Sequence, residues 1–218
     1  MTRKTLLIVS AVGAFAALLI AAAAHFARPT PPEQSAARPA DPSALVRFHS
    51  PSLGDAGAKV HIVEFLDPAC ETCRAFYPYV KEFLHANPGR VRVSIRYAPF
   101  HQGSEDIVRL LEAAKRQGKY WETLEALLAA QPQWTLQHKA RLDLAWNAIR
   151  GLGLDAERLE RDMQAPEVTR IIQQDIQDAV SLNVTKTPEF FVNGRPLPSF
   201  GYEQLRTLVE RALREHYG

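Results

Sequence analysis

The chain of 218 residues is long enough for one domain of ordinary size with additional segments. Its hydrophobic content of 46% predicts a globular fold with a substantial core, and its charged content of 23% is close to average. The net charge is only +2, and residues 45–218 carry equal numbers of basic and acidic side chains, which argues against nucleic acid as a partner.

The N-terminus has the pattern of an export segment. Arg3 and Lys4 precede an uncharged run at 5–24 that is rich in Leu, Ile, Val, Phe and Ala. A cleavable signal has an apolar core of roughly 7–15 residues and a membrane-spanning helix needs about 20, so this run lies at the border. Residues 1–27 are therefore predicted to be a signal peptide or an N-terminal membrane anchor, and the length favours the anchor. Basic residues before the run place the rest of the chain outside the cytoplasm.

Residues 28–44 are rich in Pro, Ala and polar residues, lack apolar periodicity and are predicted to be an extended linker. The folded domain is expected to begin near Leu45. Residues 60–66 form a β-branched and aromatic run that is typical of a buried strand. A helix is expected to follow from the cysteines to Asn87, because apolar residues recur there at helical spacing and Asn87-Pro88-Gly89 ends the pattern.

Residues 91–97 alternate between apolar and polar side chains and predict a strand. Its polar positions Arg92, Ser94 and Arg96 are expected to form a solvated face. A helical stretch is predicted at about 104–182. Within it, helices are expected to start at Ser104 and near Tyr120, and to cover 135–150 and 155–163. One more is expected where Val168, Ile172, Ile176 and Ala179 form a stripe.

Strand signals return near the C-terminus. Residues 189–192 (EFFV) run into Asn193-Gly194, a strong signal for a two-residue hairpin turn, and 195–197 would form the return strand. A last helix is expected at about 202–214. The strand–helix–strand order at 60–97 favours a parallel pair, to which the hairpin would add antiparallel strands. The predicted fold class is therefore α/β.

Two cysteines are present in the whole chain, and they lie three residues apart, at Cys70 and Cys73. Two thiols at this spacing at a helix start can close a small disulfide ring. Backbone N–H groups and the positive end of the helix dipole favour a thiolate on the first cysteine. Because the thiolate is the attacking species in disulfide exchange, Cys70 is predicted to be the nucleophile and Cys73 the resolving thiol.

A pair of this kind has other interpretations. A four-cysteine zinc site lacks its other two cysteines, and none of the seven histidines forms an H-x3–5-H pair for a Cys2His2 site. An inert structural disulfide this tight would constrain the chain little. Copper(I) suits two soft thiolates, although no Met-rich or His-rich segment accompanies them. We therefore expect no metal and no cofactor other than the redox-active disulfide itself.

The segments 63–73 (VEFLDPACETC) and 187–194 (TPEFFVNG), with a long helix after the first, resemble the thioredoxin-fold oxidoreductases. The helical stretch between them resembles the DsbA-type branch of that family, and the resemblance covers about 45–216. It implies a thioredoxin-like domain at 45–218, with a helical insertion at about 104–182 between its βαβ and ββα halves. It also implies a protein disulfide oxidoreductase activity.

The same resemblance implies roles for further residues. Glu64 would be a buried acid beneath the disulfide that relays protons, with a pKa raised by burial. Pro78 would kink the active-site helix. Thr187 and Pro188 would form a cis peptide bond beside the disulfide and contact a substrate peptide that pairs like an added strand.

The dipeptide Glu71-Thr72 departs from strongly oxidising members of the family, which carry a histidine before the second cysteine. A carboxylate beside Cys70 should raise the pKa of its thiol, with Arg74 partly offsetting the effect, so we expect a less extreme oxidant. The predicted function is disulfide exchange with cysteine-containing exported proteins in the bacterial periplasm. The oxidase direction is favoured, and a membrane or periplasmic redox partner would recycle the pair. A reductase or isomerase, or a copper-handling assembly module, remains the alternative.

Overall fold

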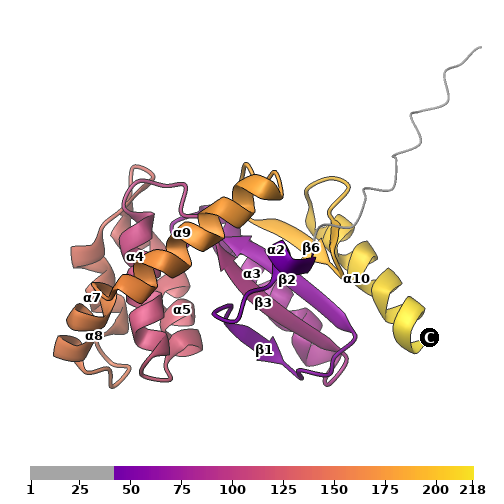
Figure 1. Ribbon diagram of the computed structural model, residues 1–218, viewed down its shortest axis with the longest axis horizontal. Helices are drawn as coiled ribbons and strands as arrows, with labels where there is room; N and C mark the ends of the chain where they lie inside the picture. The colour runs from indigo at the N-terminus through magenta and orange to yellow at the C-terminus, as the bar shows by residue number, and fades with distance from the viewer. Residues whose placement is uncertain (1–41) are drawn as a thin grey trace, which may run out of the picture. The chain divides into compact units, whose positions relative to one another are not determined.

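A five-stranded mixed sheet forms the centre of the domain (Figure 1). The structure is a computed structural model that describes residues 42–218. The predicted export segment at 1–27 and the linker up to residue 41 lie outside the described residues. Within residues 42–218, no helix has both the length and the apolar character needed to cross a membrane. In spatial order the strands are β1 (Ser52–Gly54), β3 (Val91–Tyr97), β2 (Val60–Leu66), β6 (Glu189–Val192) and β7 (Arg195–Pro196).

The predicted strand–helix–strand unit is confirmed. β2 and β3 are parallel neighbours, with Glu64 opposite Ile95, and α3 (Glu71–Ala86) connects them. α3 buries Phe76, Val80 and Phe83 in the main core. Burial of each large apolar side chain contributes roughly 1.5–3 kcal/mol, so this face of α3 fixes the helix, and the cysteines at its start, against the sheet.

The predicted hairpin after β6 is also confirmed. β6 pairs antiparallel with β2 and with β7. Asn193 and Gly194 have φ values of 47° and 79°, and a type I′ turn requires positive φ at both of these positions. The hairpin places Phe190 opposite Glu64, so the C-terminal half of the domain shares a sheet with the strand that precedes the cysteines.

The helical insertion follows β3 and confirms the α/β class with a helical segment between the two halves. Figure 1 shows α4, α5, α7 and α8 as a group beyond one end of the sheet, with α9 running from that group back across the sheet. The six helices are α4 (Ser104–Lys115), α5 (Tyr120–Ala129), α6 (Gln131–Trp134), α7 (Leu142–Ile149), α8 (Ala156–Met163) and α9 (Pro166–Ser181).

The prediction of a helix from residue 135 is wrong at its start. Residues 135–140 instead form a small hairpin of β4 (Thr135–Leu136) and β5 (Lys139–Ala140). Its turn residues Gln137 and His138 have φ values of 52° and 60°, in the left-handed region that a helix excludes. α7 therefore begins only at Leu142.

The prediction of a solvated face on β3 is wrong at Ser94 and Arg96, while Arg92 is half-buried. Ser94 and Arg96 have no solvent exposure, because α9 and the short α2 (Pro42–Leu45) cover this side of the sheet. Arg96 uses all five of its N–H groups. They donate to the carboxylates of Asp175 and Asp178 on α9 and to the carbonyl oxygens of Ala44 and Leu45, at 2.6–3.0 Å.

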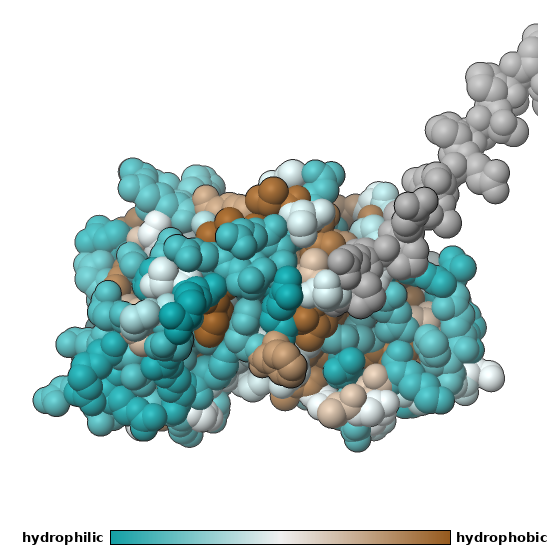
Figure 2. Space-filling model, in the orientation of Figure 1, coloured by the Kyte–Doolittle hydropathy of each residue, from teal (hydrophilic) through white to brown (hydrophobic). Residues whose placement is uncertain are grey.

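α9 presents its remaining surface to solvent. Three residues of its predicted stripe are buried, but Ile176 is 37% exposed, because Asp175 and Asp178 occupy the turns that face β3. Figure 2 shows that the face of the molecule seen there is mainly hydrophilic, with scattered apolar patches.

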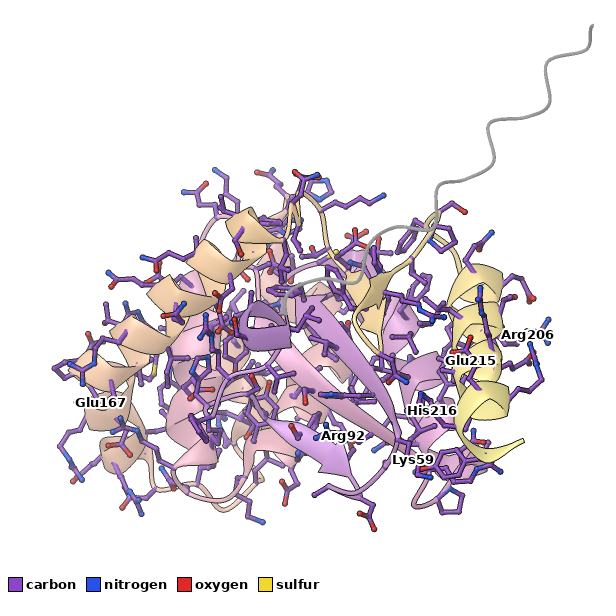
Figure 3. The ribbon with its side chains drawn as sticks, turned by 45° about the vertical axis from the view of Figure 1, so that its right-hand side comes forward. Lys59, Arg92, Glu167, Arg206, Glu215 and His216 are labelled. Atoms are coloured by element: carbon purple, nitrogen blue, oxygen red, sulfur yellow. The ribbon has the colours of Figure 1, made fainter. Side chains whose placement is uncertain are left out.

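The C-terminal helix α10 (Tyr202–Tyr217) is longer than predicted. Leu205, Val209 and Ala212 are buried against the core. The extra turn is held at Tyr217, whose hydroxyl accepts a hydrogen bond from the backbone N–H of Lys59 at 2.8 Å. The cationic groups of Lys59 and Arg90 lie 5.3 and 4.8 Å from the centre of its ring. Lys59 is visible beside the end of α10 in Figure 3.

Candidate active site

Cys70 is the residue immediately before α3, and its extended backbone (φ −76°, ψ 119°) turns the chain into the helix. Its side chain is close to the loop that precedes β6, with Sγ 3.3 Å from the carbonyl oxygen of Thr187. Both cysteines are free thiols in this structure. The segment at the helix start therefore meets the segment before β6 at the sulfur atom of Cys70.

The pKa of Cys70 is lowered from its ordinary value to about 5. The hydrogen bond from the Cys73 thiol lowers it most, and burial opposes this effect. The side chain of Thr187 and the backbone N–H groups of Cys73 and Thr72 lower it further. The carbonyl of Thr187 acts in the opposite sense, because it accepts a hydrogen bond only from the protonated thiol. The donors prevail, so Cys70 is a thiolate at neutral pH.

Titration of the reduced protein is therefore expected to show one thiol ionising near pH 5. The measurement is thiolate absorbance at 240 nm between pH 3 and 9, together with the rate of alkylation by iodoacetamide. The alkylation rate should rise through pH 5 and then stay level, since Cys70 is already ionised above it. A single step near pH 8.5, the ordinary value for cysteine, would contradict the assignment.

Cys73 has the opposite environment. It lies in the first turn of α3 with no solvent exposure. Burial raises its pKa well above the ordinary value, and its hydrogen bond to Cys70 and the charges of Glu64 and Cys70 raise it further. Cys70 is 7% exposed and Cys73 is not exposed at all, so the two thiols differ chiefly in their pKa values, which is the asymmetry required of a nucleophile and a buried partner thiol.

Glu64 is fully buried in the middle of β2. Neither of its carboxylate oxygens has a hydrogen-bond partner among the residues that the structure describes. Burial raises its pKa to about 8, and the charge of Cys70 adds to the effect. Glu64 therefore holds a proton at neutral pH, next to a buried thiol whose pKa it also raises.

The bond between Thr187 and Pro188 is cis, as the sequence resemblance implied. Glu71, by contrast, does not set the pKa of Cys70 in the expected direction. Its side chain is exposed to solvent, where water screens its charge, and the pKa of Cys70 is lowered despite it. Thr72 acts through its backbone N–H, and Arg74 is exposed, with its Nε bound to Gln131.

Two buried polar residues of the site were not predicted from the sequence. Asp67 follows β2 and accepts hydrogen bonds from the backbone of Ala69, from the backbone and ring of His101 at 2.8 and 2.7 Å, and from the Ser104 hydroxyl. Gln131 of α6 contacts the backbone of the cysteine loop directly. The sequence offered a signal for Asp67, because it lies close to the cysteine motif. It offered no signal for Gln131.

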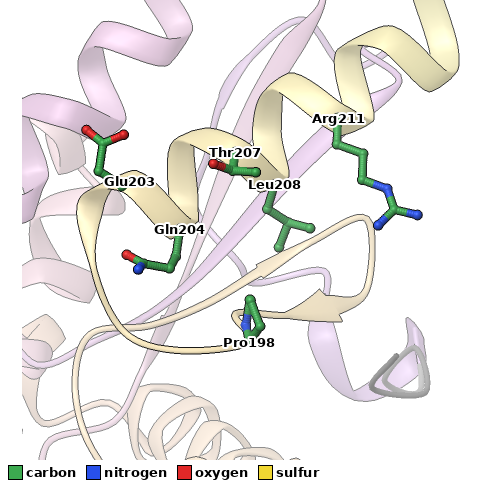
Figure 4. A pocket seen from close by; sticks show the side chains of 6 residues that line it. All are labelled: Pro198, Glu203, Gln204, Thr207, Leu208 and Arg211. Carbon is green, nitrogen blue, oxygen red and sulfur yellow. The ribbon is translucent and has the colours of Figure 1, made fainter. Parts of the chain in front are cut away.

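Other candidate sites are weaker. Within residues 42–218, no three His, Cys, Asp or Glu side chains are grouped as a metal site would require. A pocket of about 260 Å³ lies between α10 and the loop after β7 (Figure 4). Its lining contains no cysteine, and its residues are Pro198, Glu203, Gln204, Thr207, Leu208 and Arg211. The cysteine pair is therefore the strongest candidate site among the described residues.

Comparison with known proteins agrees with this geometry. A family model described as Thioredoxin matches residues 48–211. The crystal structure of a thioredoxin-like oxidoreductase from Silicibacter pomeroyi is 35% identical to the chain. It superposes with a TM-score of 0.70, covering 80% of this chain and 99% of that one. A probable disulfide bond formation protein D from Bacillus anthracis is 24% identical, over 75% of this chain and 78% of its own length.

Other curated relatives are much longer proteins. A Na(+)/H(+) antiporter NhaA from Herminiimonas arsenicoxydans is 32% identical over 145 residues, which are 66% of this chain but 22% of the antiporter. The chain spans about a fifth to a quarter of the length of this antiporter and of the similar ones that it matches. The likeness thus concerns one segment of those proteins.

Proposed function

Since this chain belongs to the thioredoxin family, we propose that it is a DsbA-like thiol–disulfide oxidoreductase that introduces disulfides into exported proteins through Cys70 and Cys73. The observation that supports this direction most is the contrast between the two thiols. Cys70 lies at the start of α3, is 7% exposed and has a pKa of about 5, whereas Cys73 is fully buried with a raised pKa. A stable thiolate at Cys70 favours the reduced form of the pair, and therefore makes its disulfide an oxidant.

The exchange proceeds in two balanced steps. A substrate thiolate attacks Sγ of Cys70 in the disulfide form, and the sulfur of Cys73 leaves and takes up the proton of Glu64. A second substrate thiolate then attacks the substrate sulfur of the mixed disulfide, and Cys70 leaves as a thiolate. The substrate dithiol has become a disulfide and the Cys70–Cys73 disulfide has become a dithiol. We expect a substrate backbone to pair at Thr187 and Pro188, since the carbonyl oxygen of Thr187 lies 3.3 Å from the reacting sulfur and its bond to Pro188 is cis.

We expect Glu64→Gln to slow oxidation by about 10²-fold at pH 7, because an amide cannot give a proton to the leaving Cys73 sulfur. Rates of mixed-disulfide formation, measured by stopped flow from pH 5 to 9, test this. In the parent protein the rate, corrected for the fraction of substrate thiol that is ionised, should fall as Glu64 deprotonates, and the variant should lack that step, because burial raises the pKa of Glu64. Glu71→Gln, an exposed carboxylate in the same motif, serves as the control. An equal loss in both variants would remove the proton-transfer role.

The proposal places the protein in the bacterial periplasm, either free or tethered to the inner membrane. What supports export is the apolar N-terminal segment at 1–27, together with a cysteine pair whose oxidised form an oxidising compartment maintains. The substrates are cysteine-containing exported proteins, and a membrane or periplasmic redox partner reoxidises the pair. The disulfide itself is the redox group, so no further cofactor enters the cycle.

The reduction potential of the Cys70–Cys73 pair tests the direction. Equilibration with glutathione buffers should give a value between those of thioredoxin (about −270 mV) and DsbA (about −120 mV). The reason is that the Cys70 pKa of about 5 lies between their values of about 7 and about 3.5. The oxidised protein should also restore disulfides to a reduced, unfolded substrate. A potential at or below that of thioredoxin would favour a reductase, and stoichiometric copper(I) binding without exchange would favour the metal-handling alternative.

A further inference from the structure

Gln131 joins the helical insertion to the backbone around the reactive cysteine. It is the first residue of α6 and has no solvent exposure. Its side-chain Nε2 donates hydrogen bonds to the carbonyl oxygen of Pro68 at 2.7 Å and to that of Cys70 at 3.0 Å. Its Oε1 accepts a hydrogen bond from Nε of Arg74 at 3.0 Å. One amide therefore holds the loop before α3 and the first turn of α3 together.

These hydrogen bonds affect the stability of the Cys70 thiolate through the backbone groups that they hold. A carbonyl oxygen carries partial negative charge and destabilises a nearby thiolate, whereas a backbone N–H stabilises it. Gln131 holds the carbonyl group of Pro68 toward the insertion, and together with the backbone N–H of Arg74 it fixes the carbonyl group of Cys70. The peptide units that follow Cys70 are then held with the N–H groups of Thr72 and Cys73 available to its sulfur, where both favour the thiolate.

We propose that Gln131 is a positioning residue through which the helical insertion sets the redox equilibrium of the Cys70–Cys73 pair. The proposal deepens the proposed function, since it identifies what tunes that same site. It assigns the insertion a part in the chemistry, although Cys70, Cys73 and Glu64 all lie outside the insertion. The favoured state is the reduced pair, because the geometry that Gln131 holds stabilises the Cys70 thiolate.

A purely structural role of the Gln131 amide would have a different effect on the two redox forms. Buried carbonyl groups need hydrogen-bond donors, and any residue that satisfies them stabilises the fold. That contribution would be equal in the oxidised and reduced proteins. A positioning role stabilises the reduced protein more, because the thiolate exists only in that state. By linkage, the difference between the two stability losses equals the change in the redox equilibrium.

The experiment replaces Gln131 with methionine, which has similar length and no donor. We expect the pKa of Cys70 to rise and the equilibrium constant for oxidation of glutathione to fall about tenfold, a shift of about 30 mV toward a weaker oxidant. Gln133→Ala changes an exposed glutamine of the same short helix and is expected to match the parent protein. Arg74→Ala removes one of the three contacts and should produce a smaller shift than Gln131→Met.

Urea unfolding of both redox forms completes the test. Gln131→Met should destabilise the reduced protein more than the oxidised one, by the same tenfold factor in the unfolding equilibrium constant. An unchanged Cys70 pKa and glutathione equilibrium, with equal destabilisation of both forms, would overturn the proposal. If Gln131→Met fails to fold, Gln131→Asn, which keeps the donor but shortens its reach, replaces it with the same expected direction. Failure of the parent protein to oxidise substrates would contradict the proposed function alone, because the glutathione equilibrium reports on Gln131 separately.

Discussion

Replacement of Cys70 with serine is expected to reduce disulfide exchange to the uncatalysed background, a loss of several orders of magnitude. A serine hydroxyl does not ionise near neutral pH and cannot form a disulfide. The remaining thiol, Cys73, is buried, and its raised pKa keeps it protonated. Neither the nucleophile nor an accessible substitute would then be present, and the reaction requires a thiolate.

Cys73→Ser is the matched variant, because it replaces the sulfur of the second cysteine with oxygen. It also loses turnover, but its Cys70 thiolate remains and should form a stable mixed disulfide. Incubation of each reduced variant with oxidised glutathione, followed by intact-mass measurement, separates the two. Rapid addition of one glutathione to Cys73→Ser and none to Cys70→Ser is expected. Equal addition to both variants would show that the assigned roles of the two thiols are wrong.

Arg96→Ala is expected to lower the free energy of unfolding by about 3–5 kcal/mol, the usual cost of leaving a buried charge without its partner. The change would remove the Arg96 guanidinium from the fully buried Asp175, which keeps only His49 and the backbone N–H of Tyr97. It would also remove one donor each from Asp178 and from the carbonyl oxygens of Ala44 and Leu45. Burial raises the pKa of Asp178, but hydrogen bonds from Arg47 and Arg96 outweigh it and hold the value at about 2. The carboxylate is therefore charged at pH 7.

Urea unfolding at pH 7, followed by circular dichroism, measures this loss. Arg170→Ala is the control, because Arg170 lies on α9 in an exposed ion pair with Glu167, and such pairs contribute only about 0–1 kcal/mol. Acid should destabilise the parent protein as Asp178 becomes protonated, since its folded pKa lies below its unfolded value. A loss below about 1 kcal/mol for Arg96→Ala would show that the network contributes little.

Features that depend on local pattern were predictable from the sequence. The buried strand β2, the amphipathic α3 and the Asn193-Gly194 hairpin each carry their signal within a few neighbouring residues. β1 was missed because it has three residues and exists only through its pairing with β3. The alternation in β3 correctly indicated two different faces. It could not show that Arg96 meets carboxylates 79 and 82 residues further along the chain.

The residues of the candidate site show the same difference between local signals and long-range contacts. The cysteine spacing and the family resemblance located Cys70, Cys73 and Glu64, because these residues lie within ten positions of one another. Gln131 acts from 61 residues away, on backbone atoms that have no sequence signature of their own. The effect of Glu71 was overestimated because a sequence does not show whether a charge is exposed. Its carboxylate is in water, and the pKa of Cys70 follows from the hydrogen bonds around the sulfur instead.

The hydrogen bonds from Arg96 to the carbonyl oxygens of Ala44 and Leu45 have a mechanical consequence. The described chain enters through α2, on the side of the sheet opposite the face that α3 covers. Tension along the entering chain would therefore pass through Arg96 into β3 and α9, which resist it with several hydrogen bonds stretched at once. The start of the described chain is thereby tied to β3 and, through Asp175 and Asp178, to α9.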